Sequence, residues 1–253
     1  MLRIYLTGEV AVERGENLLR EADLAGRQGR LAFVYLVSER ERAVTQSELA
    51  ELLWPQSLPP SWPVALSAVI SKLRQKLSTI GLDRDRIIAN AFRCYQFRPP
   101  AQAWIDVEAA ADAVHQAEGA LLASQPDAAY GPSLIATTIA RRAFLTGEDA
   151  AWVEARRERL RDLLIRALDC RVEALLWNCE LALAQDQARA AVELEPFRES
   201  GYRRLMQVLV RRGDRAEAVR VYQDCRRRLA DELGVSPSDE TESLFRALLG
   251  SPA

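Results

Sequence analysis

The sequence has little of what metal proteins and disulfide-stabilised proteins need. It contains one histidine, His115, and four widely separated cysteines with no Cys-x-x-Cys pair. A structural zinc site needs clustered cysteine or histidine ligands, and a disulfide framework needs regularly spaced cysteines, so neither is expected. We expect reduced thiols, as in a cytosolic protein, at all four positions: Cys94, Cys170, Cys179 and Cys225.

Catalytic motifs are missing as well. The sequence has no nucleophile elbow, no dinucleotide-binding glycine pattern and no metal-ligand spacing. His115 lies in a helical run, where a partly exposed helix residue is the expected interpretation. The sequence therefore predicts no catalytic residue, no cofactor and no bound metal, and an enzyme is not the expected function.

Long hydrophobic runs are also absent. No stretch reaches the ~18 consecutive apolar residues that a membrane span requires. Residues Met1 to Ile4 open directly into a strand-like pattern instead of a signal peptide. A cytoplasmic protein with no membrane partner is expected. The 253 residues, of which 49% are hydrophobic, are enough to form two domains with their own cores.

One stretch of the chain lacks acidic residues. None occurs between Glu51 and Asp83, whereas Lys72, Arg74 and Lys76 fall within five positions. A surface that approaches a polyanion needs this absence of repulsion as much as it needs positive charge.

The first part of the chain alternates short strand and helix patterns. Residues 2–24 have strand periodicity and predict a small antiparallel sheet. The apolar run 31–37 predicts a buried helix, preceded by a loop from Gly26 to Gly29. Thr45-Gln46-Ser47-Glu48 is a capping box, so a second helix is expected to begin there and to end at Trp54-Pro55.

A third helix is predicted from Ser61 to Leu77. Its apolar residues recur at spacings of three and four and form a core-facing stripe: Leu66, Val69, Ile70, Leu73 and Leu77. The helical wheel places four polar residues on the opposite face: Ser67, Ser71, Arg74 and Gln75. Lys72 and Lys76 stack one turn apart on a flank. The outer face has the chemistry to read bases, with Arg74 as a bidentate donor to guanine and the flank lysines on phosphates. An ordinary amphipathic helix with solvated lysines is the alternative.

Two short strands follow the third helix. Segments 86–90 and 94–98 predict a hairpin around Ala91-Phe92-Arg93, with Tyr95 and Phe97 on one face. The order of sheet, three helices and hairpin is that of a winged helix-turn-helix. Pro99-Pro100 is expected to end this domain, which would occupy residues 1–100.

The rest of the chain, residues 101–253, is expected to be all helical. Apparent breaks occur at prolines and glycines, among them Gly131-Pro132. Pro196 and Pro237 lie 41 residues apart, a period that is compatible with stacked helical pairs, and Tyr202–Arg211 with Ala216–Leu229 is expected to form one helical hairpin. The expected fold is mainly α with a small β component, in which a tetratricopeptide-like helical domain follows the winged helix. Residues 1–100 hold 14 basic and 11 acidic residues, a net charge of +3, and the remainder holds 20 and 25, a net charge of −5.

Several motifs resemble the Streptomyces antibiotic regulatory proteins, which join an OmpR-type winged helix to a bacterial transcriptional activator domain. The resemblance covers nearly the whole chain. It rests on these segments: Gly26–Leu31, Glu48–Trp54, Ala65–Arg74, Pro196–Glu199, Leu205-Met206, Gly213–Ala218 and Leu229–Pro237.

The resemblance implies a transcriptional activator. The helix from Ser61 to Leu77 would be the recognition helix, and Arg93 with its hairpin would be the wing that touches the minor groove or the DNA backbone. The loop Trp54-Pro55-Gln56-Ser57-Leu58-Pro59-Pro60 would face RNA polymerase. Two copies are expected to bind double-stranded DNA at tandem promoter repeats as a homodimer. A small-molecule effector stays open.

Some alternatives also stay open. The turn lacks the glycine that the family commonly places before Tyr95, which favours a scaffold or ligand sensor whose winged helix does not bind DNA. Trp62 could be a core anchor, a residue that packs on DNA, or part of a protein interface. The runs Arg156-Arg157 and Arg226-Arg227-Arg228 could bind an anionic ligand, although interleaved acidic residues favour solvated helix faces.

Overall fold

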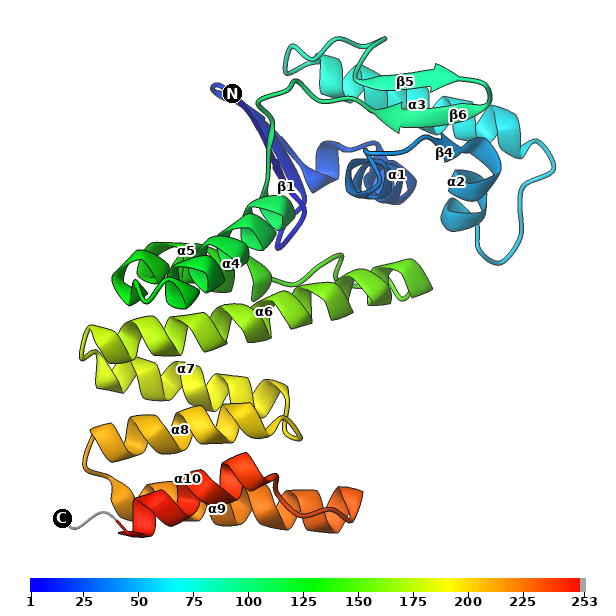
Figure 1. Cartoon of the computed structure of the whole chain (residues 1–253). Coiled ribbons are helices and arrows are strands. Elements are labelled where there is room, and N and C mark those ends of the chain that lie inside the picture. The colour runs from blue at the N-terminus through cyan, green and yellow to red at the C-terminus, as the bar shows by residue number, and fades with distance from the viewer. Residues whose placement is uncertain (251–253) are drawn as a thin grey trace. The chain divides into compact units, whose positions relative to one another are not determined.

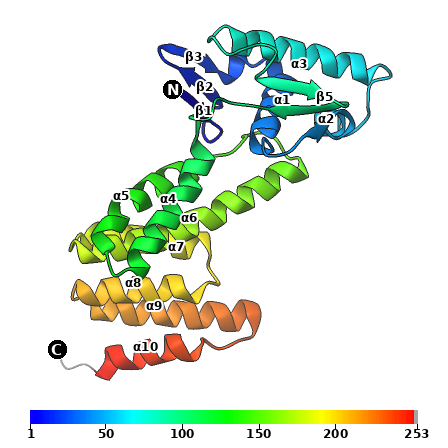
Figure 2. The same cartoon turned by 45° about the horizontal axis from the view of Figure 1, so that its top comes forward.

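The computed structural model describes residues 1–250, with side chains described up to Ala247. Packing divides the chain into two compact units (Figures 1 and 2). The first comprises Met1–Ala109 with Arg142–Arg157, and the second comprises Ala110–Arg141 with the chain from Glu158 onward. The first unit thus holds more of the chain than the domain expected at residues 1–100, and that domain division stays a prediction.

The first unit begins with a sheet of alternating residues. Strands β1 (Leu2–Tyr5), β2 (Ala11–Arg14) and β3 (Asn17–Arg20) pair antiparallel, so the sheet predicted in residues 2–24 is confirmed. Leu2 and Ile4 point to the buried side of β1, as period-two alternation requires. A 3₁₀ turn, η1 (Glu21–Asp23), follows.

Helix α1 (Gly26–Ser38) is buried along most of its length, as predicted for residues 31–37. The predicted loop at Gly26 to Gly29 is wrong, because both glycines belong to the first turns of the helix. A Cβ atom on Gly29 would lie 2.0 Å from the carbonyl oxygen of Leu24. Glycine at this position therefore permits a close backbone approach at the start of a helix and does not interrupt it.

Two further helices and a second sheet complete the winged-helix order of elements. Helix α2 (Gln46–Leu53) is capped by the Thr45 hydroxyl, and α3 (Trp62–Ser78) follows the proline-rich loop. The second sheet has the strand order β4-β6-β5. Its strands are β4 (Val44–Thr45), β5 (Ile88–Ala91) and β6 (Cys94–Phe97). Phe33 and Phe97 meet edge to face at 5.7 Å, which joins this hairpin to α1 in the core.

The chain after Pro100 returns to the first sheet instead of leaving the unit. Strand β7 (Trp104–Ile105) pairs parallel with β1. The buried Asp106 carboxylate then accepts hydrogen bonds from the backbone amides of Leu6 and Thr7 at 2.9 Å each. These bonds use two amides beyond the end of β1, so Asp106 ties the start of α4 to the sheet.

The segment Arg142–Arg157 belongs to the same unit through a buried ion pair. Glu148 is 3% exposed and accepts from the Arg30 guanidinium at 2.6 Å and from the Arg27 Nε at 3.0 Å. A buried carboxylate requires such partners. Arg27 and Arg30, from the motif Arg27-Gln28-Gly29-Arg30, therefore bind Glu148, which lies about 120 positions away in the sequence.

The second unit is a stack of helices. Helix α7 lies beside α8, and α8 lies beside α9, in both views (Figures 1 and 2), and the tetratricopeptide-like expectation is confirmed. The helices that contribute to this unit are α4 (Asp106–Leu122), α5 (Pro126–Ala140), α6 (Ala151–Trp177), α7 (Leu181–Leu194), α8 (Glu199–Arg211), α9 (Arg215–Arg228) and α10 (Asp239–Gly250), with a π-helical turn, η2 (Leu229–Leu233).

Two details of this helical unit differ from the sequence prediction. The break predicted at Gly131-Pro132 is wrong, because both residues lie inside α5. Proline removes one helix hydrogen bond, but α5 buries Ala129 and Ala136 on either side of it, and this packing keeps the helix continuous. A break that the sequence did not indicate separates α6 from α7, where Cys179 has a φ of 57°.

Helix pairs of this unit bury one apolar face each. The α8 and α9 pair predicted from the sequence is present, and its core includes Met206, Leu209 and Tyr222. The Tyr222 ring stacks on Phe245 of α10 at 3.7 Å.

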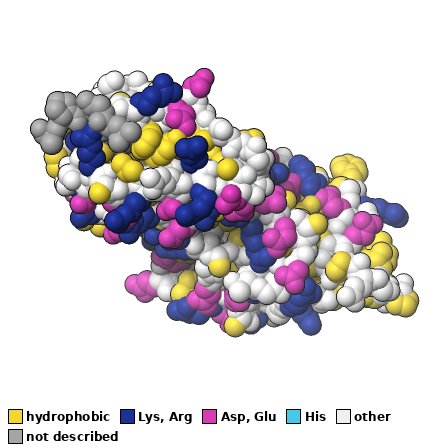
Figure 3. Space-filling view, turned by 90° about the horizontal axis from the view of Figure 1, so that it is seen from below, with side chains coloured by type: hydrophobic (Ala, Val, Ile, Leu, Met, Phe, Trp, Pro, Cys, Tyr) yellow, Lys and Arg dark blue, Asp and Glu magenta, His cyan; other side chains and the backbone are white. Residues whose placement is uncertain are grey.

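On the face seen in Figure 3, basic and acidic side chains are interleaved around a patch of hydrophobic side chains. Among the described residues, no helix combines the length and the apolar character that crossing a membrane requires.

Candidate nucleic-acid interface

Helix α3 has one buried face and one open face. Leu66, Ile70, Leu73 and Leu77 are buried, and Val69 is half-buried, so the predicted core stripe is confirmed. Five polar side chains predicted to contact DNA are exposed: Ser67, Ser71, Lys72, Gln75 and Lys76. No other element of the described unit covers them, and they present hydroxyl, amide and ammonium groups along the helix.

Lys72 and Lys76 are the only lysines of the chain, in which the other basic side chains are all arginines. They lie one helical turn apart and both are exposed. Many arginines form ion pairs with carboxylates, among them Arg30 with Glu148 and Arg42 with Glu48. Among the described residues, no carboxylate forms an ion pair with either lysine. Their positive charge therefore remains available to a partner outside the unit.

Arg74 does not lie where the helical wheel places it. It is half-buried, and its Nε and Nη2 atoms donate to the carbonyl oxygen of Ile88 at 3.1 and 2.6 Å. Ile88 belongs to β5, the edge strand of its sheet. The guanidinium thus supplies the donors that a neighbouring strand would supply, and the expectation of an outward-facing Arg74 is corrected.

The wing is a tight hairpin without glycine. Phe92 and Arg93 form its two-residue turn between Ala91 and Cys94, which pair with each other, and their φ values are 51° and 59°. Positive φ at both central residues defines a type I′ turn, which suits the right-handed twist of the strands. The predicted hairpin is confirmed, and Arg93 is exposed at its tip.

Hydrogen bonds fix the wing against the start of α2. The backbone amide of Gln46 donates to the carbonyl oxygen of Arg93 at 2.9 Å. The hairpin tip and the starts of α2 and α3 enclose a hollow of about 500 Å³. It is lined by Thr45, Gln46, Ser47, Trp62, Pro63, Phe92, Arg93 and Cys94. Trp62 is half-buried in this wall, so the core-anchor interpretation of Trp62 is wrong.

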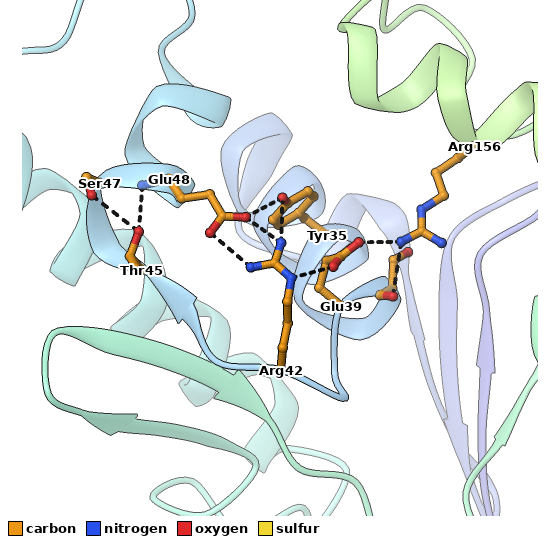
Figure 4. Close-up of polar contacts among 8 residues, drawn as sticks. Tyr35, Glu39, Arg42, Thr45, Ser47, Glu48 and Arg156 are labelled. Atoms are coloured by element: carbon orange, nitrogen blue, oxygen red, sulfur yellow. Dashed lines mark hydrogen bonds and ion pairs between the residues drawn. The ribbon is translucent and has the colours of Figure 1, made fainter.

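A network of charged groups holds α2 in place (Figure 4). The Glu48 carboxylate accepts from the Tyr35 hydroxyl at 2.6 Å and from the Arg42 guanidinium, while Arg42 also donates to Glu39 at 2.7 Å. Arg156 donates to the other oxygen of Glu39. The hydrogen bond from Arg42 lowers the pKa of Glu48, and burial together with Glu48 raises the pKa of Tyr35 to about 12.

The hydrogen bond from the Glu48 amide to the Thr45 side chain, which is one half of the predicted capping box, is present at the start of α2. The Glu48 amide donates to the Thr45 hydroxyl at 3.1 Å. The Glu48 carboxylate bonds mainly to Arg42 and Tyr35, and the Thr45 backbone is the smallest cause of its lowered pKa. The residue that the sequence assigns to a local capping box therefore also links α2 to α1.

The loop predicted to face RNA polymerase is an open, irregular segment. Between the end of α2 at Leu53 and the start of α3 at Trp62 the chain has no regular helix, and Pro55, Gln56, Ser57, Leu58 and Pro60 are exposed. Trp54 and Pro59 are half-buried and attach the two ends of the loop. A contact of this loop with RNA polymerase stays a prediction.

The comparisons with known proteins decide the family. A family model described as "Bacterial transcriptional activator domain" matches residues 105–249. The chain belongs to this family.

Two curated relatives of this activator-domain protein are regulatory proteins named AfsR. The chain is 29% identical to AfsR of Streptomyces coelicolor over 256 residues and 28% identical to AfsR of Streptomyces griseus over 253 residues. Each alignment covers 98% of this chain and 24% of the relative, so the chain spans about a quarter of the length of either relative. The resemblance to the Streptomyces antibiotic regulatory proteins is confirmed.

A solved structure shares the fold. The structure described as Mycobacterium tuberculosis EmbR in complex with a low affinity phosphopeptide superposes with a TM-score of 0.88 and 21% sequence identity. The match covers 100% of this chain and 66% of that chain. The fold, a winged helix with an activator domain, is therefore shared by the two proteins.

The helical unit of this activator-domain protein contains a second hollow, of about 420 Å³. Acidic and basic side chains both line it: Glu193, Asp224, Asp231, Glu232, Arg227 and Arg228. Arg227 is paired with Asp224, and Arg228 with Glu232. These pairs favour the solvated-face interpretation of this basic run over an anionic ligand site.

The other charged candidates of the sequence are also accounted for. Arg157 donates to Glu154 and to the carbonyl oxygens of Phe144 and Leu145. His115 is an exposed residue of α4, as predicted. Within the described residues, no group of three or more histidine, cysteine or acidic side chains is arranged to hold a metal ion.

Proposed function

We propose that this activator-domain protein is a sequence-specific DNA-binding transcriptional activator rather than an enzyme, and that it acts in the bacterial cytoplasm, where the DNA lies. The observation that carries the proposal is the open face of α3. It holds both lysines of the chain beside Ser67, Ser71 and Gln75, within a stretch that has no acidic residue.

In this proposal α3 enters the major groove. A groove about 12 Å wide admits one helix, and the serine hydroxyls and the Gln75 amide then face base edges. Lys72 and Lys76 contact phosphates from the flank. Arg93 contacts the minor groove or the backbone, and Arg74 orients the wing through Ile88 instead of reading guanine.

Two copies bind tandem promoter repeats about one helical turn, ~10 bp, apart. The helical units contact one another and set this spacing. The loop Trp54–Pro60 recruits RNA polymerase. Substitution of Gln56 and Leu58 by alanine in this loop should preserve DNA affinity and reduce transcription from a bound promoter in a reconstituted reaction.

Salt dependence tests the DNA-binding step. Duplexes are first selected from a random library with the full chain, and their affinity is then measured by fluorescence anisotropy. Affinity should fall steeply between about 50 and 200 mM salt, because several phosphate contacts release counterions. A flat response, or failure to select any duplex, would support the alternative of a scaffold or ligand sensor.

A further inference from the structure

The tip of the wing has an unusual residue. Phe92 is 100% exposed and adopts a φ of 51°, the left-handed region of backbone conformation. Type I′ turns favour asparagine and glycine because these residues tolerate positive φ at both central positions. A phenylalanine there is disfavoured by its backbone geometry, and its ring adds no contact to the core.

The exposed ring of Phe92 and its positive φ are both unfavourable for the stability of the folded chain alone. An aromatic ring left in water forgoes the free energy of burial, and a bulky residue with positive φ is strained. Strain of this kind is characteristic of functional segments. A contact of the ring with a partner outside the unit would account for both features.

The charges near the wing indicate the chemistry of that partner. From Arg86 to Ile105 the sequence has three arginines, at positions 86, 93 and 98, and no acidic residue. The wing turn also lines the hollow at the start of α3, beside Trp62 and Pro63. Arg86 is paired with Asp83, so Arg93 and Arg98 are the arginines of the wing without a carboxylate partner among the described residues. Phe92 lies at a hollow whose lining contains Arg93 and no acidic side chain, which suits a polyanion.

We propose that Phe92 is an apolar minor-groove contact, which inserts at a base step beside the site that α3 reads. The inference rests on the proposed function. Apolar side chains that enter the minor groove partly unstack a base step, and pyrimidine–purine steps such as TA and CA yield most easily. Phe92 then selects flexible steps by their deformability, and Arg93 holds the adjacent backbone or groove.

The test compares the full chain with Phe92→Asn, because asparagine accepts the left-handed conformation and preserves the turn. Each protein selects sites from a random-sequence duplex library about 30 base pairs long. The wild type should recover a flexible step at a fixed distance from the bases read by α3. Phe92→Asn should keep those bases, lose the preference at the step, and bind roughly tenfold more weakly, as for one lost base–aromatic contact.

Leu18→Ala is the matched control, because Leu18 is another exposed apolar side chain of the same unit. It should leave selection and affinity unchanged. A 2-aminopurine placed at the flexible step of the selected duplex should brighten when the wild type binds, because the base unstacks. It should stay dim with Phe92→Asn.

The outcomes separate the two proposals. Equal affinity, equal selection and equal fluorescence for wild type and Phe92→Asn would overturn the role of Phe92 and leave the proposed function intact. Failure of the wild type to bind any duplex would overturn the proposed function as well. Phe92→Asn should also raise or maintain the melting temperature, whereas a clear loss of thermal stability would assign Phe92 to folding.

Discussion

Arg74 of α3 donates two hydrogen bonds to the carbonyl oxygen of Ile88, the first residue of strand β5. The helix that faces outward and the hairpin that forms the wing are thereby joined by one side chain. Helical periodicity alone would place Arg74 on the outer face of α3, where an arginine could read guanine. A role in positioning the wing and a role in reading bases predict different effects of substituting Arg74.

Arg74→Ala should destabilise the fold. Removing a half-buried guanidinium leaves the Ile88 carbonyl without its partner, at a cost of about 1–3 kcal/mol in the free energy of unfolding. Urea denaturation measures this cost, and Arg74→Lys should recover part of it. If Arg74→Ala keeps full stability and loses sequence preference only, Arg74 reads bases and the positioning role is wrong.

Lys72→Ala and Gln75→Ala should separate phosphate contacts from base contacts. The first should weaken specific and random duplexes alike and reduce the salt slope by about one. The second should weaken the selected duplex by about 1–3 kcal/mol and relax the preference at one position. Anisotropy titrations on both kinds of duplex measure these effects. Arg159→Ala, at an exposed arginine of α6, serves as the control and should change neither. Identical behaviour of the Lys72 and Gln75 variants would contradict this division of roles.

Acid should weaken the fold in part through Glu48. The Arg42 guanidinium lowers the pKa of this carboxyl group in the folded state. A lowered pKa stabilises the fold above the unfolded pKa of about 4.3, and this contribution disappears as the pH falls through the folded pKa.

Glu48→Gln tests this linkage. The denaturation midpoint of the wild type should fall between about pH 5 and 3, and the midpoint of the variant should fall less. Glu51→Gln, at an exposed position of the same helix, should follow the wild type. Equal pH dependence of Glu48→Gln and wild type would show that Glu48 contributes nothing to acid sensitivity.

The four thiols should divide into two classes. Burial raises the pKa of Cys170 and of Cys225 to about 11, whereas Cys179 is exposed and Cys94 is half-exposed. At pH 8 a thiol reagent should label Cys179 quickly, Cys94 more slowly, and the other two only after unfolding, because the thiolate is the reactive form. Mass spectrometry of native protein identifies the labelled positions. Rapid labelling of Cys170 in the native protein would contradict its burial beside Ala117 and Ala174.

Local sequence patterns predicted the elements that depend on local rules. The core stripe of α3 follows from residue spacing, and the start of α2 from the Thr45 cap. The buried Glu148 was not predictable in the same way, because its partners on α1 are about 120 positions away in the sequence. Long-range pairing of charges leaves no periodic signal in a single sequence.

The direction of a long side chain was also beyond the sequence. A helical wheel gives the direction of the Cα–Cβ bond, but the guanidinium of Arg74 reaches back to a strand. Phe92 illustrates a different limit. Turn rules expect asparagine or glycine where φ is positive, so a phenylalanine in that conformation could be found only from coordinates.

The two lysines offer the most direct test of the open face of α3. Reductive methylation with ¹³C-formaldehyde labels Lys72, Lys76 and the N-terminal amine, and it preserves the positive charges. Lys72→Arg and Lys76→Arg assign the two lysine resonances. If α3 contacts DNA, both lysine signals should shift when the selected duplex is added at low salt and return as salt is raised. Unchanged lysine signals in a sample whose anisotropy shows bound duplex would contradict the account.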